Sequence, residues 1–286
     1  MRVRIEKVIG ASGFALAQYE QEHVKAFVGR LQGRAYNLVR VLSETGEWGG
    51  GWLPKGPAAG SLKCRKDLDG LLSVTAEMGI WVELVVSGTI KNRPLKEQMG
   101  WAKDVVKAVK GMDHVIVNVM NEPQQSSLTE EEVLELTHFV RTNTAKPVGI
   151  DVPGPIQSYV FPASLKKECD WIGCHPTRDP EPTKEQVMRW LERNGLTLFN
   201  ETNCYISDEE KKKFKIHGPN GLFYCHAQGT ETQRKNAARR AMKLFAQVGM
   251  RKARWYFHSL SGIHCMDTDF WAPDVSILHG SGTPCD

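Results

Sequence analysis

The stretch from Val115 to Pro123 reads VIVNVMNEP, and the interpretation of the whole chain starts from it. Its apolar residues, most of them β-branched, form an almost continuous run. Such a run is typical of a strand covered on both faces, as in parallel sheets. Glu122 follows the run directly, although carboxylates are rarely buried without a partner. Pro123 ends the strand because it has no N–H to donate. The pattern therefore predicts that Glu122 lies at the carboxyl end of a strand, where parallel α/β folds place their active sites.

A second stretch has the same form, since residues 197–200 read TLFN and Glu201 ends them. Two glutamates at the ends of two parallel strands can face one pocket. Retaining glycosidases need such a pair, a general acid/base and a nucleophile with carboxyl groups about 5 Å apart. Each glutamate by itself is more consistent with an ordinary strand-end residue paired with a Lys or Arg. The two matching contexts, with Asn121 before Glu122, favour the catalytic interpretation.

The composition is that of an ordinary soluble globular protein. The chain has 286 residues, of which 41% are hydrophobic and 24% charged, and its net charge is +4. The one dense basic run, residues 211–213, follows an acidic run at residues 208–210, which argues against a nucleic-acid patch. No apolar run is long enough for a transmembrane helix, and the N-terminus lacks an apolar signal core. We therefore expect no membrane partner, and either a mature secreted chain or cytoplasmic synthesis with release by lysis.

The seven cysteines form neither a disulfide framework nor a zinc motif, because they are sparse and no CxxC pair occurs. His264 and Cys265, with His258 and His279 nearby, could hold a metal ion. Scattered core and loop positions are the favoured interpretation for these residues. We expect no metal and no organic cofactor.

Predicted strands and helices alternate along the chain, with no break in composition between them. The predicted strands cover residues 3–9, 13–17, 37–42, 80–86, 115–120, 147–151, 170–174, 197–200 and 254–257. The predicted helices cover residues 20–32, 67–78, 94–110, 129–143, 157–169, 183–194 and 231–248. This alternation predicts a single-domain (β/α)8 TIM barrel over residues 1–286, with an irregular last helix. A doubly wound sheet is the alternative, but polar residues at the ends of many strands favour one central mouth.

Arg40 lies in the middle of the predicted strand at residues 37–42, where a charge must be paired or face a cavity. One interpretation is an ion pair inside the barrel, with Glu83 as the candidate partner. The other is an arginine that lines the site and keeps a catalytic carboxylate ionised. The residues themselves leave both interpretations open.

Two long loops carry aromatic residues. Trp48 and Trp52 belong to a glycine-rich loop over residues 43–63, and Tyr205 belongs to a loop over residues 202–229. Long loops in a compact domain are usually functional, and a flat ring can stack on the apolar face of a sugar. A tryptophan folded under its own loop is the equally probable alternative for each one.

The sequence resembles the glycoside hydrolases of clan A, most closely family 5-like β-glycanases, across nearly the whole chain. The residues that carry the resemblance are NLVRVL with Arg40, VMNEP with Asn121 and Glu122, WIGCHP with His175, and LFNET with Glu201. The resemblance implies that Glu122 is the acid/base and Glu201 the nucleophile, with Arg40 beside the nucleophile. It also implies that Asn121 binds the sugar 2-hydroxyl and that Trp255 is an aromatic platform, with His175 in the site. Family members commonly carry His-x-Tyr where this chain has residues 175–177 as HPT, so Tyr205 is a candidate replacement.

The leading hypothesis is a monomeric retaining endo-β-glycoside hydrolase that cleaves a polysaccharide or oligosaccharide of the β-glucan or β-mannan type. A carbohydrate-binding barrel without catalysis, part of a larger assembly, is the alternative. Binding alone needs no acid pair with Asn121 and Arg40, which argues against that alternative. An unrelated barrel enzyme is a third possibility, but no strand-end lysine suited to a Schiff base stands out.

Overall fold

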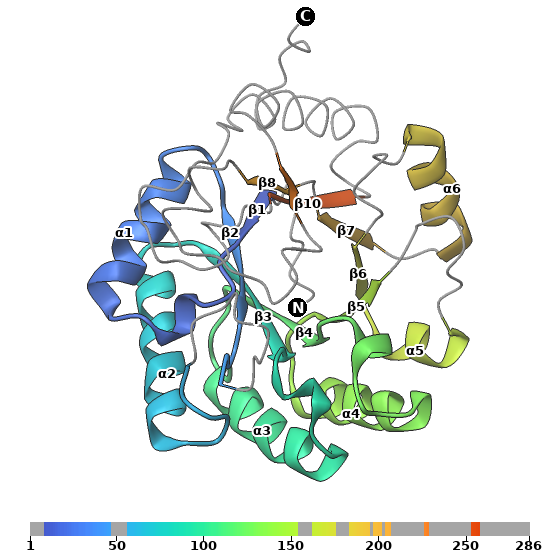
Figure 1. Ribbon diagram of the computed structural model, residues 1–286, viewed down its shortest axis with the longest axis horizontal. Coiled ribbons are helices and arrows are strands. Elements are labelled where there is room, and N and C mark those ends of the chain that lie inside the picture. The colour runs from blue at the N-terminus through green and yellow to red at the C-terminus, as the bar shows by residue number, and fades with distance from the viewer. Residues whose placement is uncertain are drawn as a thin grey trace, which may run out of the picture.

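The computed structural model describes residues 9–46, 56–153, 162–175, 183–194, 197–201, 204–206, 226–228 and 253–257. Eight parallel strands close into a barrel in the order β1-β10-β7-β6-β5-β4-β3-β2 (Figure 1). The strands are β1 Ile9–Ser12, β2 Leu38–Leu42, β3 Trp81–Ser87, β4 Val115–Met120, β5 Val148–Pro153, β6 Trp171–His175, β7 Thr197–Glu201 and β10 Ala253–Phe257. The predicted barrel is confirmed, and its closure excludes the doubly wound sheet.

Helices surround the barrel, as Figure 1 shows. They are α1 Gln21–Gln32, α2 Leu62–Glu77, α3 Leu95–Ala108, α4 Glu130–Asn143, α5 Ala163–Glu168 and α6 Lys184–Asn194. Short 3-10 helices follow three of the strands: η1 Leu16–Gln18, η2 Ile90–Asn92 and η3 Pro123–Gln125. Within the described residues, no helix is long and apolar enough to cross a membrane.

Local sequence explains where individual helices begin and end. The predicted capping box of α4 is confirmed: the Thr129 hydroxyl accepts the N–H of Glu132, and the Glu132 carboxylate accepts the N–H of Thr129. Helix α2 begins at Leu62 rather than at the predicted Asp67, because the Ser61 side chain caps it.

Strands β2, β3 and β4 bury both of their faces along almost their whole length. One face packs against the helices in a large apolar core, in which fully buried valines and leucines contribute roughly 1.5–3 kcal/mol each. Strand residues in this core include Val39, Val41, Val82, Leu84, Val86, Val115, Val117, Val119, Val148 and Ile150. The other face points into the barrel, and it carries the polar residues described below.

The predicted strand over residues 13–17 is wrong. Strand β1 ends at Ser12, the N–H of Gly13 donates to the carbonyl of Arg40, and the chain then turns into η1. Phe14 and Ala15 are buried with Leu42 and Val85, so the apolar run reflects a buried turn rather than a strand. A short apolar run alone cannot distinguish the two.

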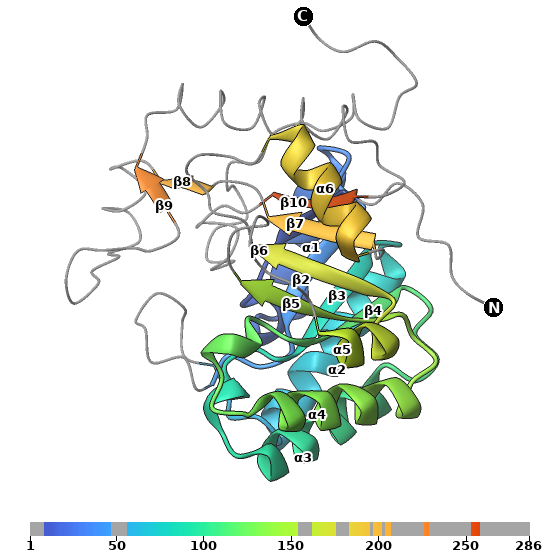
Figure 2. The same ribbon diagram turned by 90° about the vertical axis from the view of Figure 1, so that its right-hand side faces the viewer.

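Two other predicted segments differ from the structure or lie outside it. The predicted loop over residues 202–229 contains two short parallel strands, β8 Cys204–Ile206 and β9 His226–Gln228. These strands lie on the side of the molecule toward which β5 and β6 point, as Figure 2 shows. The predicted helix over residues 231–248 lies outside the described residues, as does most of the predicted strand over residues 3–9.

Candidate active site

The two predicted catalytic glutamates stand at the carboxyl ends of barrel strands. Glu122 comes two residues after the end of β4, and Glu201 is the last residue of β7, where it is in register with Tyr256 of β10. Strands β5 and β6 separate β4 from β7 in the barrel, and all of these strands are parallel. Both glutamates therefore belong to the same mouth. The side chain of Glu201 is outside the described part of the chain, so the separation of the two carboxyl groups stays a prediction.

The backbone of Glu122 is left-handed, with φ 53° and ψ 67°. Among the described residues other than glycine, only Ala35 and Glu122 have a positive φ. Such a conformation costs about 1–3 kcal/mol and persists where the surrounding structure enforces it, often at functional sites. Here Pro123 starts η3, and the carbonyl of Glu122 accepts the N–H of Gln125 at 2.9 Å. The side chain of Glu122 is 22% exposed, so it reaches solvent at the mouth.

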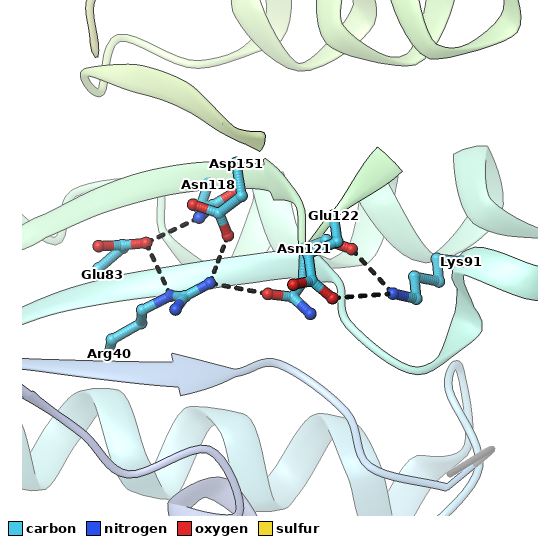
Figure 3. Close-up of polar contacts among 7 residues, drawn as sticks. All are labelled: Arg40, Glu83, Lys91, Asn118, Asn121, Glu122 and Asp151. Carbon is cyan, nitrogen blue, oxygen red and sulfur yellow. Dashed lines mark hydrogen bonds and ion pairs between the residues drawn. The ribbon is translucent and has the colours of Figure 1, made fainter. Parts of the chain in front are cut away.

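Arg40 lies at the centre of a buried polar network inside the barrel (Figure 3). Its Nε is 3.2 Å from Glu83 Oε1, and its Nη2 donates to Asn121 Oδ1 at 2.8 Å. The same nitrogen pairs with Asp151 on β5. Because β2 and β5 are not neighbours in the sheet, this pair crosses the barrel interior. The predicted ion pair with Glu83 is thus confirmed, and Arg40 also contacts the residue that precedes the candidate acid/base.

Further contacts hold the members of this network in place. The Asn118 side chain donates to Glu83 Oε1 at 2.7 Å, and the Arg40 guanidinium lies 5.0 Å above the Phe14 ring. Arg40, Glu83 and Asp151 are each no more than 2% exposed. Charges this deeply buried must be paired, since an isolated one would cost several kcal/mol.

Asp151 depends on a glycine in the neighbouring strand. It is in register with Gly173 of β6, and a Cβ built on Gly173 would lie 1.7 Å from Asp151 Oδ1. Any side chain at residue 173 would therefore displace the carboxylate. Only glycine leaves the space that lets Asp151 reach Arg40.

Lys91 approaches the site from the side opposite Arg40, as Figure 3 shows. Its Nζ donates to the carbonyl of Asn121 at 3.2 Å and lies 3.9 Å from Glu122 Oε2. Burial lowers the pKa of Lys91, while the negative charges of Glu122 and Asp151 partly oppose that shift. Sequence reasoning missed this residue, because a lysine in the short helix η2 between β3 and α3 carries no pattern of its own.

Glu44 holds the loop that carries Lys91. Its Oε1 accepts the N–H groups of Thr89 and Ile90 at 2.7 and 2.8 Å, and its Oε2 accepts the Thr89 hydroxyl. Burial raises the pKa of Glu44, and these hydrogen bonds act in the opposite direction. Glu44 thereby ties the end of β2 to the start of η2.

For the remaining predicted site residues, the structure describes the backbone alone or does not describe the residue. His175 ends β6, Trp255 lies in β10 in register with Ile9 and Asn200, and Tyr205 lies in β8. Trp48 and Trp52 lie outside the described residues, as do His258, His264, Cys265 and His279. Of the predicted residues, the described contacts bring together Arg40, Asn121 and Glu122.

Comparison with known proteins shows what this fold resembles. No protein-family model matches the chain, and no curated protein sequence matches it. Among solved structures, a glycoside hydrolase of family 5 from Bacteroides vulgatus has a TM-score of 0.61 at 14% identity, over 88% of this chain and 58% of that one. An endo-1,4-β-mannanase from Rhizomucor miehei has a TM-score of 0.60 at 9% identity, over 90% and 87% of the two chains. A β-1,4-mannanase of family GH113 has a TM-score of 0.58 at 14% identity, over 91% and 90%.

At sequence identities of 9–14%, the similarity to these structures shows the fold alone. The resemblance to clan A glycoside hydrolases that the sequence motifs indicate is confirmed at that level. The chain spans 54–65% of the length of the first three similar structures.

Proposed function

We propose that this chain is a retaining β-glycoside hydrolase, with Glu122 as the general acid/base and Glu201 as the nucleophile. The observation that carries the proposal is the placement of both glutamates at the carboxyl ends of β4 and β7 in one closed barrel. Further support comes from Asn121, which the Arg40 guanidinium orients beside Glu122. Structures of similar fold include proteins named as endo-1,4-β-mannanases. We propose a β-mannan or β-glucan, cleaved within the chain, as the substrate.

The reaction proceeds in two steps, and the proton that Glu122 gives up in the first step is regained in the second. In the first step, a carboxylate oxygen of Glu201 bonds to the anomeric carbon while the glycosidic C–O bond breaks, and Glu122 gives its proton to the leaving oxygen. In the second step, Glu122 takes a proton from water, and the water oxygen attacks the anomeric carbon. The ester bond to Glu201 then breaks, and both carboxyl groups return to their starting states.

Asn121 serves this chemistry through the sugar 2-hydroxyl. Its side-chain oxygen is already occupied by Arg40, so its amide nitrogen is the group left to donate toward a sugar. Such a contact strengthens in the transition state. His175, Trp255, Tyr205, Trp48 and Trp52 are proposed to bind further parts of the sugar chain, with the aromatic rings stacking on pyranose faces.

The test is a screen of reducing-sugar release from β-mannan, β-glucans, xylan and chitosan. We expect release from at least one of the first two, and a loss of at least about 10³-fold in both Glu122→Ala and Glu201→Ala, which remove groups that act in the reaction itself. Glu131→Ala, at an exposed position of α4, is the matched control and should keep wild-type activity. Binding of a polysaccharide without any release would instead support the non-catalytic carbohydrate-binding barrel.

A further inference from the structure

Lys91 is a buried cation placed against the backbone and side chain of the Asn121–Glu122 pair. Its side chain is 8% exposed, although lysine side chains normally extend into solvent. Its Nζ contacts the Asn121 carbonyl, Glu122 Oε2 and, at 3.4 Å, the Gln125 side-chain oxygen. Two of these acceptors come from the turn that leads from β4 into η3, and the third comes from the last residue of η3.

The backbone of Lys91 is held as firmly as its side chain. Its carbonyl accepts the Gln98 side-chain amide at 3.1 Å and the N–H of Ser127 at 3.2 Å. Glu44 fixes the two residues before it by accepting their N–H groups. The ammonium group therefore needs little further ordering to stay beside Glu122, and this distinguishes it from a surface ion pair that contributes almost nothing.

An ammonium group close to a carboxylate stabilises the charged form of the carboxylate. An acid/base residue must be protonated in the first step of a retaining reaction and ionised in the second. In the described part of the chain, the other charged groups near this pair are Arg40, which contacts the Asn121 side chain, Asp151, whose charge acts on Lys91, and Glu44, which binds the two residues before Lys91. Neighbouring carboxylates oppose the ionisation of Glu122, whereas Lys91, with its Nζ 3.9 Å from Glu122 Oε2, favours it.

We propose that Lys91 is a positioning residue that holds the left-handed turn at Glu122 and fixes the pH at which Glu122 gives up its proton. This inference rests on the proposed role of Glu122 as the acid/base. The cation favours the ionised form of Glu122, which the second step needs. Without Lys91, the surrounding carboxylates would hold the proton on Glu122 and slow the second step.

The test is the pH profile of kcat/KM, whose alkaline limb reports the acid form of Glu122 in the free enzyme. Lys91→Met should move that limb to higher pH by about one unit, the size of shift that a neighbouring opposite charge produces. Lys91→Arg should restore the limb toward its wild-type position, because it keeps the charge. Lys63→Met, at a 64% exposed lysine of α2, is the matched control and should leave the limb in place.

A second variant keeps the proposal testable if Lys91→Met does not fold. Gln125 is exposed, so Gln125→Glu keeps the shape and should fold while adding a negative charge beside Lys91. It should move the alkaline limb in the same direction as Lys91→Met. The proposal is overturned if the alkaline limb of the pH profile stays in place in folded Gln125→Glu. The same must hold in Lys91→Met where that variant folds.

A readout without substrate separates this inference from the proposed function. The carboxyl carbon signal of Glu122, assigned by its loss in Glu122→Gln, can be titrated by NMR in the wild-type and variant proteins. A midpoint raised in Lys91→Met or Gln125→Glu supports the role of Lys91 even if no polysaccharide is cleaved. Absence of cleavage with that shift present would count against the glycosidase proposal alone.

Discussion

The Arg40 guanidinium donates to the Asn121 side-chain oxygen at 2.8 Å, and this bond joins the interior ion-pair network to the turn that carries Glu122. Asn121 is 4% exposed, and its backbone carbonyl accepts Lys91 from the other side. The residue before the candidate acid/base is therefore fixed by two cations, one inside the barrel and one at its rim.

The two catalytic roles can be distinguished with azide. With an activated aryl glycoside, Glu122→Ala should form the glycosyl-enzyme and stall at its hydrolysis, because departure of a good leaving group needs little protonation. Azide needs no general base, so it should restore turnover and give a β-glycosyl azide with retained configuration. Glu201→Ala with azide should give the opposite anomer or no product. NMR analysis of the product configuration tests this assignment. An inverted product from Glu122→Ala would show that the acid/base and nucleophile roles are the other way round.

Arg40→Ala should destabilise the protein by about 3–5 kcal/mol, because it leaves Glu83 and Asp151 as buried charges without their cation. Urea denaturation measures the change. Arg65→Ala is the control: Arg65 is 51% exposed and pairs with Asp104 at the surface, so its loss should cost no more than about 1 kcal/mol. Equal losses in the two variants would contradict a structural role for the interior network.

Gly173→Ala should destabilise the barrel and lower activity, because its Cβ would occupy the place of Asp151 Oδ1. Gly100→Ala in α3 is the matched control. A Cβ there meets nothing within 4 Å, so alanine should stabilise the helix by roughly 0.5–1 kcal/mol. Thermal unfolding of the two variants should therefore shift in opposite directions. A Gly173→Ala protein as stable as wild type would show that the Asp151 carboxylate can move without cost.

The contribution of Glu44 to stability should depend on pH. Its pKa in the folded protein is raised above the ordinary value of 4.5, so the folded state holds this proton more tightly than the unfolded state. The free energy of unfolding should therefore fall, through Glu44, as pH rises from about 4.5 through the raised value. Glu44→Gln lacks this titration and keeps an oxygen to accept from Thr89 and Ile90. Urea denaturation across pH should show the wild type losing stability relative to Glu44→Gln as pH increases, and a constant difference would contradict the assignment.

Local pattern was sufficient for the strands and helices with strong periodicity. Strand β4 and the capping box of α4 follow directly from β-branched runs and from the Thr129–Glu132 spacing. Pattern failed at residues 13–17, because a buried turn and a buried strand have the same apolar composition. It also placed the start of α2 too late, because the Ser61 cap precedes the first apolar residues of the helix stripe.

The sequence by itself predicted the alternation of strands and helices and placed Glu122 and Glu201 at strand ends, since strand endings and residue types are local properties. Closure of the sheet into a barrel, rather than a doubly wound sheet, was decided by the tertiary structure. The sequence also determined that Arg40 needed a partner, because a charge inside a buried strand cannot remain alone. Only the tertiary structure decided which partners it has. Glu83 meets Arg40 because the two residues are in register on the neighbouring strands β3 and β2. Asp151 on β5 and Asn121 after β4 meet it because barrel closure brings strands that are not neighbours to one interior. Lys91 acquires its place beside Glu122 because two loops that follow adjacent strands end at one rim.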